Sequence, residues 1–299
     1  MTRSRNGSDV CVRWLAYLLS SEVYKTRIKG LATGTSGTMK NIGKDALLAV
    51  PIAFPSGSEQ RSIANALSDA DCLLIKLDQF IAKKRDLKQA AMQQLITGKT
   101  RLAGFHDEWE ETNFGAIGEC FIGLTYKPEN VVEHGLLVLR SSNIQNGRLA
   151  FADNVYVNLK VTEHLITRPG DLLICVRNGS RALIGKSAVI DETAADHTFG
   201  AFMSVYRTRH WRFIAYAFQA YDIQRQIRDN IGATINQITN KDMKALRVKL
   251  PPASEQIAIA EVLSDMDAEL AALEQRREKT RALKQGMMQA LLTGITRLV

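Results

Sequence analysis

The chain has few of the residues that build metal sites, disulfide frameworks or membrane spans. Its 299 residues include four cysteines, and no two of them have the CxxC spacing of a metal or redox site: Cys11, Cys72, Cys120 and Cys175. The five histidines form no HxxxH or HxxE pattern. Its longest apolar runs are far shorter than the roughly 20 residues that span a bilayer. The sequence therefore predicts free thiols in a reducing compartment, no metal site, and a cytoplasmic protein without a membrane partner.

Motifs for nucleotide binding and catalysis are also missing. The segment NGSRALIGKS (Asn178–Ser187) is similar to a phosphate-binding loop, but five residues instead of four separate Gly179 from Gly185, and a strand-like sequence follows. The chain has no HExxH, GxSxG or protein-kinase motif set. A catalytic DNA methyltransferase or nuclease would need a glycine loop for its cofactor or a carboxylate cluster on strands. We therefore expect no catalytic, cofactor-binding or metal-binding residues in this chain.

Basic residues outnumber acidic ones, with 39 lysines and arginines against 31 aspartates and glutamates and a formal net charge of +8. Hydrophobic residues make up 45% of the chain, which is a globular composition. Excess positive charge favours a polyanionic partner, because lysine and arginine neutralise phosphates and release counterions. Composition therefore keeps nucleic acid as a candidate partner, beside the alternative of an ordinary basic protein.

One amphipathic segment occurs twice. LKQAAMQQLITGKTRL (Leu87–Leu102) returns as LKQGMMQALLTGITRL (Leu283–Leu298). Residues 58–102 align without a gap to residues 254–298, at an offset of 196 (254 − 58), and 25 of the 45 aligned positions are identical. The similarity continues upstream, where RWLAYLL (Arg13–Leu19) matches RFIAYAF (Arg212–Phe218). The chain therefore contains two copies of one module, while residues 103–210 occur once.

Each copy predicts one long helix. Ser58 and Ser254 are placed as N-caps after a proline, and Gly98 and Gly294 stand where a glycine ends a helix. About 40 residues at 1.5 Å each give a helix of roughly 60 Å. Apolar residues recur at alternating steps of three and four, as at Leu67, Ala70, Leu74 and Leu77, which is the a/d pattern of a coiled coil. The alternative is that each helix packs on its own globular domain. We expect the helices to pair with each other through Leu67, Leu74, Leu77, Leu263, Leu270 and Leu273.

The segment between the repeats has a different sequence pattern. Short β-rich runs bounded by Gly, Asn, Asp or Pro occupy residues 136–144, 149–158, 171–177, 185–191 and 200–207. A helical stretch with apolar residues at spacings of three and four follows at Phe213–Ile231. The predicted fold class is α+β, with one mixed sheet-and-helix domain and two long helices that form an antiparallel coiled coil.

Three loops of this domain carry the polar and basic side chains that read base edges and hold phosphates. They are residues 140–148, residues 176–181 between two strands, and residues 233–237 ahead of a strand. Each alone is an ordinary polar loop, but together on a basic chain they predict a DNA-reading surface. With the nearby Lys186, its candidate residues are Arg140, Ser141, Asn143, Arg148, Arg177, Asn178, Ser180, Arg181, Thr234, Asn236 and Gln237.

Two groups of segments carry a family resemblance. LPPASEQIAIAEVLSDMDAEL (Leu250–Leu270) and its earlier copy FPSGSEQRSIANALSDAD (Phe54–Asp71) open the two long helices. WEETNFGAIGECFIG (Trp109–Gly123) is similar to the start of a target-recognition domain, and RPGDLLICVRNGS (Arg168–Ser180) to its middle. On these residues the chain resembles, over essentially its whole length, the specificity (S) subunit of type I DNA restriction–modification enzymes.

The resemblance implies a non-catalytic, sequence-specific DNA-binding subunit. In that family, two target-recognition domains each read half of a split double-stranded DNA site. Two paired helices act as the spacer between them and dock two methyltransferase (M) subunits, and endonuclease/translocase (R) subunits complete the restricting complex. S-adenosylmethionine, ATP and Mg are then expected on the partner subunits, with no cofactor in this chain.

The sequence departs from the family pattern because it holds one whole recognition domain where two are expected. The predicted domains are a C-terminal remnant of a first target-recognition domain (1–53), a first spacer helix (54–102), a complete target-recognition domain (103–250) and a second spacer helix (251–299). Such a chain would be a truncated subunit, a fragment or a split-gene product. A structural coiled-coil adaptor without base specificity and an inactive S fragment are the alternatives. Self-association that rebuilds two-reader symmetry stays open as well.

Overall fold

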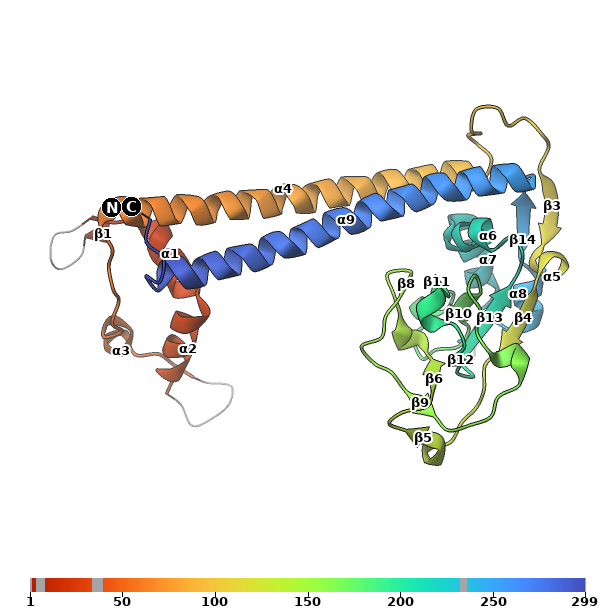
Figure 1. The fold of residues 1–299 in the computed structure, drawn as a ribbon, viewed down its shortest axis with the longest axis horizontal. Helices are drawn as coiled ribbons and strands as arrows, with labels where there is room; N and C mark the ends of the chain where they lie inside the picture. The colour runs from red at the N-terminus through yellow and green to blue at the C-terminus, as the bar shows by residue number, and fades with distance from the viewer. Residues whose placement is uncertain (1, 4–8, 34–39, 232–235, 299) are drawn as a thin grey trace. The chain divides into compact units, whose positions relative to one another are not determined.

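The computed structural model describes residues 2–3, 9–33, 40–231 and 236–298 (Figure 1). The chain divides into two compact units. We call Met1–Arg85 with Ala268–Val299 unit 1, and Asp86–Asp267 unit 2. Each of the two long helices contributes residues to both units, so each unit contains a piece of both.

The two repeated segments form helices of 40 residues each, α4 (Gly57–Ile96) and α9 (Ala253–Leu292). Both end before a glycine with positive φ, Gly98 at 68° and Gly294 at 75°, as the sequence predicts. A left-handed backbone conformation costs glycine little free energy because glycine has no Cβ. Each helix therefore stops at the equivalent position of the repeat.

The prediction of Ser58 and Ser254 as N-caps is wrong, because both helices begin earlier. The amide of Gln60 donates to the carbonyl of Ser56 at 2.9 Å, and that of Gln256 donates to the carbonyl of Pro252 at 3.0 Å. The hydroxyl of Ser56 accepts from the amide of Glu59 at 3.2 Å, so Ser56 caps α4. Ser58 and Ser254 lie inside the first turn.

The two helices run antiparallel within each unit. In unit 1, three ion pairs join the helices: Asp71–Lys284, Asp78–Arg277 and Lys84–Glu269. As residue numbers rise along α4, those of the partners on α9 fall. In unit 2, Lys88 pairs with Asp267 and Arg101 pairs with Glu255 in the same sense. This pairing confirms the predicted antiparallel arrangement of the long helices.

Unit 1 otherwise holds short helices: α1 (Val12–Ser20), α2 (Glu22–Gly30) and α3 (Lys44–Leu48). Its strands in the described residues are β1 (Thr2–Arg3) and β2 (Asp9–Val10), which pair antiparallel. Trp14 and Leu18 of α1 are buried in one cluster with Leu67 of α4 and Leu291 of α9. The core of unit 1 therefore forms where α1 meets both long helices.

Unit 2 contains the mixed α+β domain that the sequence predicts. One antiparallel sheet has the order β11-β10-β13-β4, and the other has the order β12-β6-β9-β5, in which β12 and β6 are parallel. The first sheet comprises β4 (Glu119–Ile122), β10 (Leu172–Cys175), β11 (Ser187–Val189) and β13 (Met203–Arg207). The second comprises β5 (Val131–Val132), β6 (Leu136–Leu139), β9 (Tyr156–Val157) and β12 (Thr198–Phe199).

Two smaller pairings complete the domain. A hairpin joins β7 (Ile144–Gln145) to β8 (Arg148–Leu149) through Asn146 and Gly147, both with positive φ. Where the domain begins and ends, β3 (Glu110–Asn113) pairs antiparallel with β14 (Arg247–Leu250). The start and end of the domain are thus tied together beside the spacer helices that flank it in sequence.

The predicted β-rich runs contain strands that are shorter than expected. The run 136–144 ends its strand at Leu139, because Ser141–Asn143 turn into a 3₁₀ helix closed by the Asn143 side chain. The predicted helix 213–231 breaks at Ala220 into α6 (Trp211–Gln219) and α7 (Tyr221–Asn230). The expectation that the third loop precedes a strand is wrong, because α8 (Asn240–Ala245), capped by Thr239, comes before β14.

The helices of unit 2 bury their apolar faces against the first sheet and the long helices. Phe213, Ile214 and Phe218 of α6 have no exposed surface and share a cluster with Tyr206 of β13 and Leu263 of α9. Burying side chains of this size contributes about 1.5–3 kcal/mol each. This cluster holds α6 to both the sheet and the long helix α9.

Candidate nucleic-acid interface

The structure brings residues from all three predicted DNA-reading loops together. The Asn178 amide nitrogen donates to the Ser141 hydroxyl at 3.4 Å, which links the first loop to the second. The Asn236 amide nitrogen donates to the Gly179 carbonyl at 3.0 Å, and Arg177 forms a β-bridge with Gln237. We call residues 140–142, 177–181 and 236–237 the loop surface.

The loop surface adjoins an aromatic side chain, Phe202, that the sequence did not predict and that lies against the predicted Arg177. Arg177 is exposed, and its guanidinium carbon lies 5.1 Å from the ring centre of Phe202. Phe202 is itself 56% exposed, on the turn between β12 and β13. The sequence interpretation assigned residues 200–207 to one β-rich run. Gly200 and Ala201 instead form a turn, and the glycine was the feature of the sequence that could have indicated it.

Several candidates have structural roles instead. Asn143 is fully buried, and its amide nitrogen donates to the Ala150 carbonyl at 2.9 Å. Arg181 donates to the carbonyls of Arg228 and Ile231 at the end of α7, at 3.2 and 3.4 Å. Both side chains are therefore hydrogen-bonded to backbone carbonyls of the same domain, where they support the loops.

Three further candidates do not present free side chains on the loop surface or are not described. Arg148 of the β7–β8 hairpin donates to the Asp267 carbonyl on α9 at 3.3 Å. Lys186, the residue before β11, donates to the Ser141 carbonyl at 3.1 Å and so supports the first loop. Thr234 lies outside the described residues. The remaining candidates are Arg140, Ser141, Arg177, Asn178, Ser180, Asn236 and Gln237.

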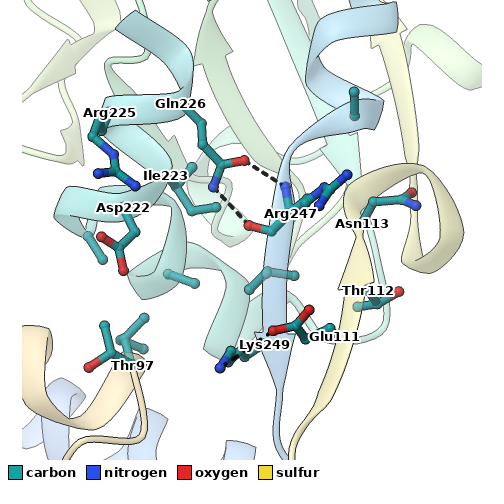
Figure 2. Close-up of a pocket in the computed structure, with 15 residues that line it drawn as sticks. Thr97, Glu111, Thr112, Asn113, Asp222, Ile223, Arg225, Gln226, Arg247 and Lys249 are labelled. Atoms are coloured by element: carbon teal, nitrogen blue, oxygen red, sulfur yellow. Dashed lines mark hydrogen bonds and ion pairs between the residues drawn. The ribbon is translucent and has the colours of Figure 1, made fainter. Parts of the chain in front are cut away.

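A second concave region lies between α7 and the β3–β14 pair, with a volume of about 810 Å³ (Figure 2). The Gln226 carboxamide points at the backbone of Arg247, accepting from its amide at 2.8 Å and donating to its carbonyl at 3.0 Å. Lys249 and Glu111 form an ion pair across the two strands at 3.5 Å. The Gln226 contacts thus fasten α7 to β14, and the ion pair joins β14 to β3.

The predicted helix-pairing leucines lie along the paired faces to different depths. Leu67 and Leu263 are fully buried, and Leu77 and Leu270 are 6% exposed. Leu74 and Leu273 are half-buried. The deepest positions are those that also touch a flanking domain, since Leu67 packs with Trp14 and Leu263 packs with α6.

A polar joint occurs twice, once in each unit, at equivalent positions of the repeat. In unit 2, Asp267 of α9 accepts from Lys88 of α4 at 2.6 Å and from Tyr216 of α6 at 3.0 Å. Burial, and then the neighbouring Asp267 carboxylate, raise the pKa of Tyr216. The tyrosine therefore stays a hydrogen-bond donor, and it ties the domain helix to both long helices.

In unit 1, the same joint consists of Asp71, Lys284 and Tyr17. Asp71 accepts from Lys284 at 2.5 Å and from Tyr17 at 2.7 Å. Burial opposes the charged carboxylate, but the hydrogen bonds from Lys284 and Tyr17 outweigh it, so the pKa of Asp71 is lowered. The pairing of each aspartate with a tyrosine of a domain helix is a tertiary contact that the local sequence does not reveal.

The ends of the long helices are also locked by equivalent ion pairs. Arg101 holds both oxygens of the buried Glu255, at 2.6 and 2.7 Å, and Trp109 adds a third donor at 3.0 Å. Arg297 holds both oxygens of Glu59 at 2.6 Å. Bidentate arginine–carboxylate pairs fix geometry as well as charge. Each unit thus repeats one scheme for joining the two long helices.

The described residues contain no candidate for a metal site or a membrane-spanning helix. Within the residues that the structure covers, no cluster of three or more His, Cys, Asp or Glu side chains could hold a metal ion. In the same residues, no helix is both long and apolar enough to cross a membrane. What the geometry does provide is an exposed polar and aromatic loop surface on a domain anchored to a pair of antiparallel helices.

That combination defines a structural class: a mixed α+β domain attached to a pair of long antiparallel helices. Residues 106–282 match the family model described as the type I restriction modification DNA specificity domain. The match covers more than half of the chain, which therefore belongs to this family.

Named relatives are specificity subunits. The chain is 32% identical over 196 residues to the type I restriction enzyme EcoKI specificity subunit of Escherichia coli K12, and 28% identical over 200 residues to the StySPI specificity subunit of Salmonella potsdam. These alignments cover 62% of this chain in both cases, but only 42% and 43% of those proteins. The chain thus spans less than half the length of these two relatives.

Solved structures share the fold. An S subunit from M. genitalium matches 94% of this chain and 72% of its own with a TM-score of 0.61 at 20% identity. A structure titled for complex assembly and conformational transition of the type I R-M system matches 93% of this chain and 70% of its own, with a TM-score of 0.57 at 17% identity. At these identities the likeness establishes the architecture, which agrees with the predicted fold class.

Proposed function

We propose that the chain is a sequence-specific DNA-binding specificity subunit of a type I restriction–modification enzyme. Residues 103–250 act as the target-recognition domain and read one half of a split double-stranded DNA site. Residues 54–102 and 251–299 act as the spacer helices, and residues 1–53 correspond to the end of a first recognition domain. The subunit supplies recognition and has no catalytic role.

The observation that carries the proposal is the loop surface. Three loops far apart in sequence converge there, with Arg177 exposed and stacked on Phe202. Arginine serves both phosphates and base edges, and a carboxamide such as that of Gln237 matches the donor and acceptor pattern of adenine. Asn178 and Asn236 hold the loops to one another. The neighbouring bonds to Lys186 and Asn143 hold the first loop in shape, which preorganises the surface for DNA.

The chemistry of modification and cleavage belongs to partner subunits in this proposal. Methyltransferase subunits dock on the paired helices and bring S-adenosylmethionine, and endonuclease/translocase subunits bring ATP and Mg. The exposed apolar residues Leu73, Ile75 and Phe80 of α4 lie outside the seam and suit a protein partner.

Sequencing of DNA retained from a random duplex pool tests the function. The chain, assembled with a type I methyltransferase subunit, should enrich one short half-site. Arg177→Ala should lower affinity for that site by about tenfold, in the range of one lost base or phosphate contact. Arg225→Ala is the matched control, because Arg225 is an exposed arginine that lines the α7–β14 region instead of the loop surface.

A structural adaptor would behave differently in the same experiment. It would retain DNA without enriching any sequence, or it would retain none, and both arginine variants would behave like the parent. Either outcome would contradict the proposed function.

A further inference from the structure

A small hollow beside the loop surface has features that the general proposal does not explain. It has a volume of about 430 Å³ and is lined by residues 124–126, 140–142, 153 and 200–203. All of these lie in unit 2. The aromatic side chains in its lining are Tyr126 and Phe202, and the polar ones include Arg140 and Ser142.

The turn that carries Phe202 is held rigidly. The Gly200 amide donates to the Leu139 carbonyl at 3.0 Å. The Phe202 carbonyl accepts from the amides of Val176 and Arg177 at 3.0 and 3.1 Å. A single exposed aromatic ring is ordinary on a protein surface. Here the ring is fixed on a short turn and backed by a stacked arginine, which preorganises it for contact with a ligand.

Two residues that line the hollow, Arg140 and Ser142, have donor atoms without acceptors. Arg140 Nε and Ser142 Oγ are two of the six buried side-chain polar atoms that have no hydrogen-bond partner among the described residues. Such atoms cost about 1–3 kcal/mol each and call for an explanation. The Arg140 guanidinium also contacts Asp153, its carboxylate at 2.9 Å and its carbonyl at 3.3 Å. The Asp153 side chain is mostly exposed and such a pair contributes little, so an acceptor on a ligand can compete for the guanidinium and for the Ser142 hydroxyl once these side chains rotate toward the hollow.

An apolar surface next to unsatisfied donors selects among base edges. In the major groove, thymine presents its O4 acceptor beside a C5-methyl group. Guanine presents two acceptors without a methyl group, adenine an acceptor and a donor, and cytosine a donor. Thymine alone combines an acceptor with an apolar group, so its edge fits Phe202 together with Arg140 and Ser142.

We infer that this hollow reads a thymine edge within the recognised half-site, with Phe202 on the methyl group and Arg140 or Ser142 donating to O4. The inference rests on the proposed function, since it names a base and the residues that read it. It assigns to Phe202 a specificity role that neither charge nor loop polarity predicts.

Uracil substitution tests the inference, because it removes only the methyl group. Each thymine of the enriched half-site is replaced in turn by uracil, and binding of the methyltransferase-assembled chain is measured. At one position uracil should weaken binding by about fivefold. Phe202→Ala should weaken binding to thymine DNA by a similar factor, with no further loss on uracil DNA. Ser142→Ala should reduce discrimination between thymine and cytosine at that position.

Controls separate the possible failures. Phe151→Ala removes another partly exposed phenylalanine of unit 2, which lines a different concavity, and it should keep the full uracil effect. An unchanged thermal melting curve should show that Phe202→Ala is folded. Additive losses from Phe202→Ala and uracil, or an enriched half-site with no methyl-dependent thymine, would overturn the inference and leave the proposed function standing. A pool with no enrichment would overturn both.

Discussion

Units 1 and 2 contain the same joint between helices but differ in what the joint carries. Both have an aspartate that accepts from a lysine on the other long helix and from a tyrosine on a domain helix. In unit 2 that domain helix, α6, also packs against a four-stranded sheet. In the described part of unit 1, the only sheet is the pairing of β1 with β2, two residues each.

The difference is visible in burial at matched positions. Phe218 of α6 has no exposed surface, while its equivalent Leu19 of α1 is half-buried. The repeat therefore preserves the joint, while the α1 position that matches Phe218 is less buried than its counterpart in α6.

The largest expected effect comes from removing the matched apolar side chains. Phe218→Ala should destabilise unit 2 by about 3–5 kcal/mol, because it opens a cavity in a closed core. Leu19→Ala should destabilise unit 1 by less than about 2 kcal/mol, since its side chain is already partly in water. Hydrogen exchange measured on each unit's amides separates the two effects. Equal losses of stability would contradict this comparison, because they would mean that Leu19 of α1 is as well buried as Phe218 of α6.

The tyrosines of the joint should give a smaller and equal effect. Tyr216→Phe and Tyr17→Phe each remove one hydrogen bond to a carboxylate that keeps its lysine. The expected loss is about 1–2 kcal/mol in the unit that carries the substitution. The same exchange measurement applies, with the neighbouring unit as internal control. A loss confined to one of the two variants would mean that the tyrosine hydrogen bond contributes to stability in one unit and not in the other, despite the same geometry.

Acid should destabilise unit 1 modestly through the carboxylates of Glu59 and Asp71. The bidentate hydrogen bonds from Arg297 hold the pKa of Glu59 below its ordinary 4.5, and the pKa of Asp71 is held below 3.8. A lowered folded-state pKa contributes stability above the unfolded value and loses it as pH falls through the folded value. Unit 1 should therefore weaken progressively below about pH 4.5.

Glu59→Gln is the test of that dependence. The variant should be less stable at neutral pH and should lose part of the acid dependence in unit 1, as followed by urea unfolding across pH. If acid unfolding of unit 1 were the same in the variant and the parent, the Glu59–Arg297 pair would not be its source.

The long helices were the most predictable part of the fold because their signals are local and duplicated. The leucine spacing, the absence of proline and the terminal glycines set α4 and α9 to within a few residues. Their starts were misplaced because the capping contact depends on where the chain turns, and Ser56 is two residues ahead of the predicted cap.

The recognition surface was only partly predictable, because convergence of loops is a tertiary property. Residue types pointed to Arg177, Asn178 and Asn236, which do come together. Nothing in the local sequence distinguished the buried Asn143 from its exposed neighbours, or showed that Arg181 would bond the end of α7. Phe202 was missed for the opposite reason, since an apolar residue within a β-rich run is ordinarily counted as core.

The central claim is that one recognition surface, in unit 2, reads DNA while the residues of unit 1 in this chain do not. The most direct test is hydroxyl-radical footprinting on the enriched site, with the mass of the complex measured to establish that one copy of the chain is bound. We predict a protected segment over a single half-site, lost with Arg177→Ala. Two separate protected half-sites from one copy of the chain would contradict the account.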